Sequence, residues 1–284
     1  IALDYCAAGC WQEAASLWNI AIAEGIVTPM TYYYLGWCLH QGGLPGVKQA
    51  FDDAVKACPD YCFPNRLEAI LALQCAMEQN PNDARAPYYL GNLYYDKRQY
   101  DLSMEAWETS ARLDDSFPTV WRNLALAFFN KKNEEAKAIE CMERAFRLDS
   151  TDARILMELD QLYKRVRRSH KERLAFLQQY PYLIKQRDDL ILEESTLLNQ
   201  TGEYDKAKTG LDAHNFHPWE GGEGKVPAQY QLARVELAKK ALAAGDNKKA
   251  ISLLEECLEY PHHLGEGKLY GAQEKDFYYF LGCA

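Results

Sequence analysis

The chain of 284 residues is 48% hydrophobic and 26% charged, and it is long enough to bury a substantial core. Its formal net charge of −9 argues against a general binder of nucleic acid or of anionic membranes, because both targets are themselves negatively charged. Nine cysteines are too sparse for a disulfide scaffold and their number is odd, so we expect reduced thiols and a cytoplasmic protein.

The sequence has neither the apolar stretch of a membrane span nor the start expected of a signal peptide. No apolar stretch approaches the ~18 residues that span a bilayer, so no membrane partner is expected. The opening residues, IALDYCAAGC, contain neither an initiator Met nor a basic stretch ahead of an apolar one. We therefore expect a fragment of a longer protein.

The aromatic content, with 19 Tyr, 10 Phe and 6 Trp, is explained by an internal repeat. Residues 1–23 contain the second half of one unit, and residues 66–81 predict a lone second helix. Complete units cover residues 32–59, 84–117 and 118–151, and Gly91 and Ala125 occupy the same place in neighbouring units, 34 residues apart. Three units share a small residue early and a large one later: Gly36 with Phe51, Gly91 with Trp107, Ala125 with Met142.

The pattern weakens after residue 151. Residues 164–190 are irregular and contain a basic run at 164–171, which fits a solvated helix end or, alternatively, a local patch for an anionic partner. Weak units follow near Gly202 and near residues 238–254, and Tyr278 and Gly282 begin a first helix at the end of the chain.

Apolar residues at helical spacing, separated by Gly, Asn-Pro and Asp-Ser turns, predict antiparallel helix pairs that must stack to bury their faces. The 34-residue unit resembles the tetratricopeptide repeat (TPR). The resemblance implies an all-α fold, a right-handed superhelical solenoid over residues 1–284, in which most aromatic side chains pack between helices.

The same resemblance implies a concave groove that binds a protein or peptide. Positions that line this groove in TPR proteins correspond here to Arg85, Tyr88, Asn92, Tyr95, Arg122, Asn123, Phe129 and Arg154. Asn92, Asn123 and Arg154 occupy three positions of a clamp that holds a peptide carboxylate in some TPR domains. Tyr88 and Glu158 stand at the other two positions, where basic residues are usual, so the clamp is incomplete.

Residues 213–228 predict a non-repeat loop because their Pro, Gly and Trp content ends the preceding helix. The candidate residues of this loop are His217, Trp219, Glu220 and Lys225. A phosphate-binding loop is excluded for GGEGK, because Trp219 stands where the motif requires Gly and Val226 where it requires Ser or Thr.

The HPWEGGEGK string and the ending LGEGKLYGAQEKDFYYFLG are similar to the C-terminal TPR region of large bacterial proteins that carry an N-terminal β-sandwich domain of unknown function. This resemblance implies an intramolecular N-terminal partner domain and a link to carbohydrate metabolism. It leaves an alternative function open, in which the chain is an accessory module of a carbohydrate-active enzyme and the loop lies near a sugar site.

No enzymatic activity is predicted for the chain. Adjacent carboxylates such as Asp188 and Asp189 point about 100° apart on a helix, and no nucleophile has a recognisable His and acid arrangement. No second close pair or His completes a tetrahedral metal site for either cysteine pair. His214 and His217 could converge with His262 and His263 from two loops to bind a metal, but surface histidines are more often incidental. No metal and no cofactor is therefore expected. The sequence does not determine the oligomeric state.

Overall fold

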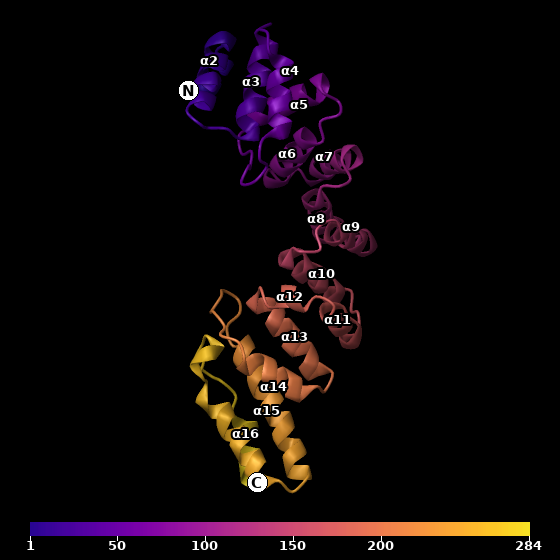
Figure 1. The fold of residues 1–284 in the computed structure, drawn as a ribbon, viewed down its shortest axis with the longest axis vertical. Coiled ribbons are helices and arrows are strands. Elements are labelled where there is room, and N and C mark those ends of the chain that lie inside the picture. Colours follow the sequence, from indigo (N-terminus) through magenta and orange to yellow (C-terminus); the bar gives the residue numbers. More distant parts are fainter. The chain divides into compact units, whose positions relative to one another are not determined.

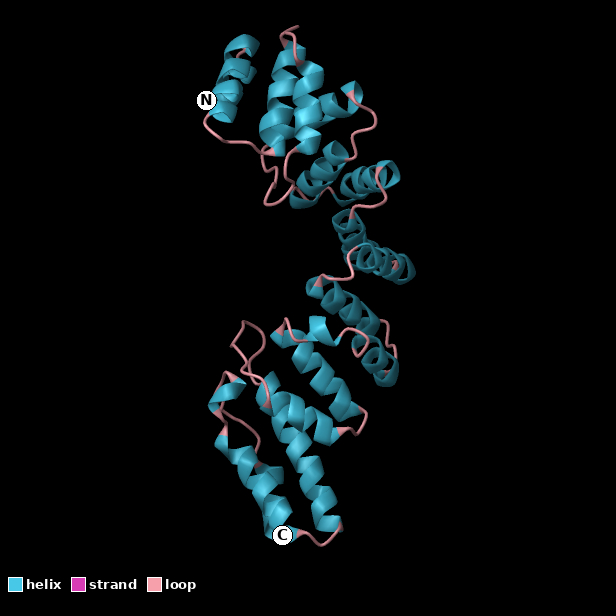
Figure 2. Ribbon diagram, viewed as in Figure 1, coloured by secondary structure: helices cyan, strands magenta, loops and turns pink.

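A computed structural model describes all residues, 1–284, as helices joined by turns and loops, without a β-strand (Figure 2). The prediction of an all-α fold built from helix pairs is confirmed. The chain divides into two compact units, Ile1–Asp149 (unit 1) and Ser150–Ala284 (unit 2). The expectation of one solenoid over 1–284 stays a prediction. No helix is both long and apolar enough to cross a membrane.

Unit 1 consists of antiparallel helix pairs, among which α3/α4, α6/α7 and α8/α9 pack closely (Figure 1). Its helices are α1 (Ala2–Ala7), α2 (Trp11–Ala23), α3 (Pro29–Gln41), α4 (Val47–Lys56), α5 (Glu68–Gln79), α6 (Arg85–Asp96), α7 (Tyr100–Leu113), α8 (Pro118–Ala127), the π-helical turn η1 (Phe128–Lys132) and α9 (Glu135–Leu148). The lone second helix predicted at 66–81 is α5.

Two glycines fix how closely the pairs in unit 1 approach. A Cβ atom built on Gly36 would lie 2.4 Å from the Phe51 ring, and one on Gly91 would lie 2.4 Å from the Trp107 ring. Real Cβ atoms do not approach other atoms so closely, so each glycine forms a notch that holds the aromatic ring of the second helix. The aromatic residue on the second helix is therefore a packing residue, as the repeat pattern predicts.

The helices of unit 2 differ more in length, from four residues to 19. They are α10 (Ala153–Arg165), α11 (His170–Leu177), α12 (Pro181–Ile184), α13 (Asp188–Gln200), α14 (Tyr204–Asp212), α15 (Lys225–Ala243), α16 (Asn247–Glu259), the 3₁₀ turn η2 (His262–Leu264) and α17 (Lys275–Cys283). Residues 164–190, expected to be irregular, form the end of α10 and the short helices α11 and α12. A Ser169–Glu172 capping box begins α11.

Buried ion pairs hold the first part of unit 2 together. The Arg173 guanidinium, which is 2% exposed, donates to Asp160 at 2.6 Å and to Glu193 at 2.6 Å, and so connects α11 with α10 and α13. Lys164 of the basic run also donates to Glu193, at 2.9 Å. An unpaired buried charge would cost several kcal/mol, so these helices depend on one another. Part of the basic run thus has an internal acidic partner.

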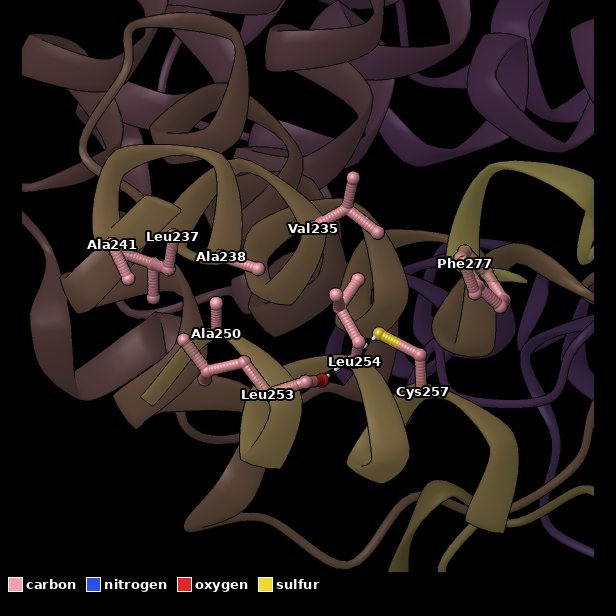
Figure 3. Close-up of a cluster of buried hydrophobic side chains, with 9 residues drawn as sticks. All are labelled: Val235, Leu237, Ala238, Ala241, Ala250, Leu253, Leu254, Cys257 and Phe277. Carbon is pink, nitrogen blue, oxygen red and sulfur yellow. Dashed lines mark hydrogen bonds between the residues drawn. The ribbon is translucent and has the colours of Figure 1, made fainter. Parts of the chain in front are cut away.

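The last three helices share an apolar cluster. Leu254 and Cys257 on α16 face Val235 and Ala238 on α15, and Phe277 brings α17 into the same core (Figure 3). The Cys257 thiol donates to the Leu253 carbonyl at 3.3 Å, as expected for a small buried residue of a helix.

The glycine notch predicts that Gly91→Ala destabilises unit 1. The added Cβ would collide with Trp107, and overpacking of this kind costs about 1–3 kcal/mol of unfolding free energy. Urea denaturation followed by circular dichroism measures the effect.

Gly282→Ala is the matched control, because Gly282 is helical and a Cβ there would meet no atom within 4 Å. This change is expected to leave unfolding unaltered or to stabilise unit 2 by up to about 1 kcal/mol. Equal destabilisation by the two substitutions would contradict the notch.

Candidate functional site

The first candidate surface is built on α6 and α8, the first helices of two neighbouring repeats. Helix α6 begins at a buried carboxylate, because Asp83 accepts hydrogen bonds from the backbone N–H groups of Arg85 at 2.7 Å and Ala86 at 3.1 Å. The hydroxyl of Tyr33 on α3 donates to the same carboxylate at 2.9 Å. The start of α6 is therefore fixed relative to α3.

Asn92 is the centre of a hydrogen-bonded chain across three helices. Its Oδ1 accepts from the indole N–H of Trp107 on α7 at 3.0 Å and from the Nδ2 of Asn123 on α8 at 3.1 Å. Both lone pairs of this oxygen are thus in use, and the Asn92 amide is held in one orientation. Asn123 is the outer member of the chain and is half-buried. We call Trp107, Asn92 and Asn123 the amide chain.

Arg85 and Tyr88 lie on α6 beside the start of α8. The Tyr88 ring packs edge-on against Phe117, with ring centres 4.9 Å apart, and the Arg85 guanidinium lies 3.9 Å above the same ring. Tyr88 is only 7% exposed, and burial raises the pKa of its phenol. The structure therefore places Tyr88 among packing residues and leaves little of it accessible to a ligand.

Arg85 differs from Tyr88 because one of its donors is unused. Its Nη1 atom is buried and has no hydrogen-bond acceptor in the structure. A buried donor without an acceptor lowers the stability of the folded protein. One face of this guanidinium packs on the Phe117 ring.

Tyr95 lies two turns after Tyr88 on α6, in an aromatic group. Its ring centre is 5.2 Å from that of Tyr100 and 5.4 Å from that of Trp107, and the Lys131 ammonium lies 4.1 Å from the Tyr100 ring centre. Tyr95 is partly exposed at the edge of this group.

The remaining predicted residues of this surface are distributed between the two units. Arg122 on α8 and Phe129 in η1 are partly buried, and both have contacts within the protein. Arg154 belongs to α10 in unit 2, where its Nε donates to Glu158 at 3.2 Å. Of the three clamp positions, Asn92 and Asn123 meet in unit 1, whereas Arg154 pairs with the glutamate that sequence analysis identified as unfavourable for a carboxylate.

Charge is distributed unevenly between the first and second helices of unit 1. Helices α3 and α8 have no acidic residue, and the only one in α6 is Asp96 at its last position. The second helices α4, α7 and α9 each carry at least two acidic residues. We call the surface formed by α6 and α8 the α6/α8 face. It is free of carboxylates along most of its length and contains Arg85 and Arg122, although the whole chain has a net charge of −9.

The second candidate is the loop between α14 and α15, residues 213–224, which a single carboxylate anchors. Asp188, at the start of α13, accepts from the His217 backbone N–H at 2.8 Å and contacts the imidazoles of His214 at 2.8 Å and His217 at 3.2 Å. Burial of Asp188 opposes its ionisation, but these hydrogen bonds outweigh burial and hold its pKa below the usual range. The adjacent Asp189 instead pairs with Arg187 at 2.7 Å.

The loop also packs against residues 260–267. The Phe216 backbone N–H donates to the His263 carbonyl at 2.8 Å, and the Gly224 N–H donates to Glu266 at 2.8 Å. At Gly265 (φ +77°) a Cβ would lie 2.5 Å from the Phe216 carbonyl oxygen, so only glycine fits there. Two segments that the sequence separates by about 45 residues thus form one structure.

A pocket of about 260 Å³ opens around Trp219. The indole ring lies against Gly222, where a Cβ would be 2.3 Å from the ring, so Gly222 admits the tryptophan. The pocket is lined by His217, Pro218, Trp219, Glu220, Gly222, Glu223, Val226, Leu264 and Glu266. Of the predicted loop residues, Lys225 lies outside this lining, as the first residue of α15.

Histidines from both loop segments line a neighbouring pocket of about 630 Å³, to which His217, His262 and His263 contribute. The structure contains no group of three or more His, Cys, Asp or Glu side chains placed to hold a metal ion. The imidazoles of His214 and His217 instead contact Asp188.

The anchoring role of Asp188 predicts that Asp188→Ala loosens the loop. Backbone amides of residues 214–217 are expected to exchange with deuterium roughly tenfold faster, because the N–H of His217 and two imidazoles lose their acceptor. Asp189→Ala removes only the pair with Arg187 and is expected to leave the loop unchanged.

The lowered pKa of Asp188 also sets the pH dependence of loop docking. The contribution of the Asp188 carboxylate to loop docking is fully present above pH about 4. It disappears as the pH falls through the pKa that Asp188 has in the folded state, which is lower than the usual value. Faster amide exchange at residues 214–217 in Asp189→Ala than in Asp188→Ala would contradict the anchoring role of Asp188.

Comparison with known proteins agrees with the repeat pattern. Residues 88–153 match a family model described as tetratricopeptide repeat. This match covers α6 to α9, which carry the first candidate surface.

Several solved structures are similar to the chain at low sequence identity. The C-terminal part of a TPR repeat-containing protein from Cytophaga hutchinsonii is 17% identical, with a TM-score of 0.49, and the match covers 90% of this chain and 93% of that one. YrrB, described as a TPR protein with an unusual peptide-binding site, is 18% identical, with a TM-score of 0.47 over 68% of this chain and 95% of that one. PilF from Pseudomonas aeruginosa is 17% identical, with a TM-score of 0.45, and the match covers 80% of this chain and 89% of that one.

Proposed function

Because the chain contains tetratricopeptide repeats, we propose that it is a non-catalytic scaffold that binds an extended polypeptide segment along the α6/α8 face. The segment belongs to a separate protein or to an N-terminal domain of the same polypeptide. Helical repeats commonly present a continuous surface formed by their first helices, and such surfaces bind extended peptides.

The amide chain is the observation that carries this proposal. An amide side chain offers a donor and an acceptor in one plane, which matches the N–H and C=O groups of a peptide backbone. With Asn92 held by Trp107, the partly exposed Asn123 is pre-oriented across the junction between two repeats. Pre-orientation lowers the entropic cost of binding.

Charge defines the class of segment. Arg85 is partly exposed at the start of α6, so its guanidinium could donate to a carbonyl or carboxylate of the bound segment. The α6/α8 face contains two arginines and only one acidic residue, Asp96 at the end of α6, so it attracts acidic segments and tolerates neutral ones. We therefore propose a neutral or acidic segment rather than a basic one.

The test uses a peptide selected by the full chain from a phage-displayed random library. Asn123→Ala and Arg85→Ala are each expected to raise its dissociation constant at least about tenfold, or ~1.4 kcal/mol, in fluorescence anisotropy. The selected sequences are expected to be depleted in Lys and Arg.

Arg112→Ala on α7 and Arg147→Ala on α9 are matched controls, because both arginines are exposed on second helices. They are expected to leave the affinity unchanged. Peptides whose binding depends on the control arginines and not on Asn123 or Arg85 would refute the α6/α8 face as the binding surface.

A second candidate function, binding of a sugar by an accessory module of a carbohydrate-active enzyme, is favoured by the pocket around Trp219. Its volume of about 260 Å³ suits a single sugar ring, and Glu220, Glu223 and Glu266 provide acceptors for hydroxyl groups beside an aromatic surface. Because the loop is anchored on α13, this pocket is formed before a ligand arrives.

Glycan-array binding by the full chain tests this second candidate. Any glycan retained by the protein is expected to be lost in Trp219→Ala and kept in Tyr270→Ala, because Tyr270 is fully exposed and lies outside the pocket lining. Glycan binding that survives Trp219→Ala, or no binding to any glycan on the array, would reject a sugar site in this chain.

A further inference from the structure

Two buried thiols meet between the first and third helices of unit 1. The Sγ of Cys6 on α1 lies 3.3 Å from the Sγ of Cys38 on α3, and the two residues are 4% and 0% exposed. Both cysteines are free in the structure. The sulfur atoms need to move only slightly closer to bond, since a disulfide bond is about 2.05 Å long.

Helix α1 packs mainly against α2, and the Cys6–Cys38 contact links it to α3 as well. The helix has six residues, and Cys6 is its only buried residue. Cys38 is held more firmly, because α3 is a 13-residue helix with most of its residues buried. The two thiols thus belong to a short helix with little buried surface and to a core helix, which differ in how readily they open.

We propose that Cys6 and Cys38 form a reversible oxidative modification site, at which a disulfide bond joins α1 to α3. The oxidant is a low-molecular-weight disulfide such as oxidised glutathione. The Cys6 thiolate attacks one sulfur of the oxidant, forms a mixed disulfide and releases the first glutathione thiolate. The Cys38 thiolate then attacks the Cys6 sulfur and releases the second.

Electrons and protons balance in this exchange. The two cysteines lose two electrons and two protons, and oxidised glutathione takes up both to become two molecules of reduced glutathione. Excess reduced glutathione or dithiothreitol reverses the reaction.

Burial determines the order of the two steps. It raises the pKa of both thiols, so that neither is a nucleophile while α1 is docked. Local opening of α1 exposes Cys6 first, and return of α1 to its place brings the mixed disulfide to Cys38. The reaction is therefore expected to be slow and limited by local opening of α1.

The bond would enclose α2 within a covalent loop and fix the first helices of unit 1 to α3. Closing a loop of about 30 residues restricts the unfolded chain, and for a unit of this size the midpoint of thermal unfolding is expected to rise by roughly 5 °C or more. Oxidation would thus hold α1 and α2 more firmly against α3.

The test incubates the full chain with oxidised glutathione and maps disulfides by mass spectrometry under non-reducing conditions. We expect a linked Cys6–Cys38 peptide, a higher unfolding midpoint, and reversal of both by dithiothreitol. Cys58→Ser is the matched control, because Cys58 is exposed and its loss is expected to leave the linked peptide intact.

Two variants test the order of reaction and remain informative if the linked form is unstable. Cys38→Ser is expected to trap a glutathione adduct on Cys6, whereas Cys6→Ser is expected to leave Cys38 unmodified; circular dichroism checks that both variants fold. The proposal is overturned if Cys6 and Cys38 stay unlinked under conditions that modify Cys58, or if Cys6→Ser allows rapid modification of Cys38 in the folded protein.

Discussion

The close approach of two helix pairs in unit 1, α3/α4 and α6/α7, depends on a glycine that lies against an aromatic ring. Gly91 leaves space for Trp107, and Gly36 does the same for Phe51. The interaction is steric, so a methyl group in either notch would force the helices apart or displace the ring. The hydrogen bond from Trp107 to Asn92 joins the same two helices, α6 and α7.

The same packing contact gives the α6/α8 face its chemistry. Trp107 fills the Gly91 notch with its ring and, through its indole N–H, holds Asn92, which in turn accepts from Asn123 on the next repeat. In the proposed function, packing and recognition therefore depend on one side chain, Trp107. Unit 2 is stabilised differently, by buried charges such as Arg173 with Asp160 and Glu193, and its loop is positioned by Asp188.

The sequence predicts those features that depend on spacing along the chain. Small and large residues at a 34-residue period identified the helix pairs of unit 1, the lone helix α5 and the packing role of Trp107. Partners in space could not be predicted in the same way. The pattern of adjacent carboxylates indicated a solvated position for Asp188, whereas its role as an anchor depends on a loop residue 29 positions away. Tyr88 corresponds to a groove position in the repeat, but its ring packs against Phe117. The Arg154–Glu158 pair, in contrast, follows from i,i+4 spacing on one helix and is predictable from the sequence.

Hydrogen–deuterium exchange of the full chain, with and without a bound peptide, tests most directly the claim that the α6/α8 face binds polypeptide. Binding along this face predicts slower exchange at residues 85–96 and 118–129, where Arg85, Asn92 and Asn123 lie, with exchange in α4, α7 and α9 unchanged. Protection confined to the second helices, or to the loop at 213–224, would contradict it.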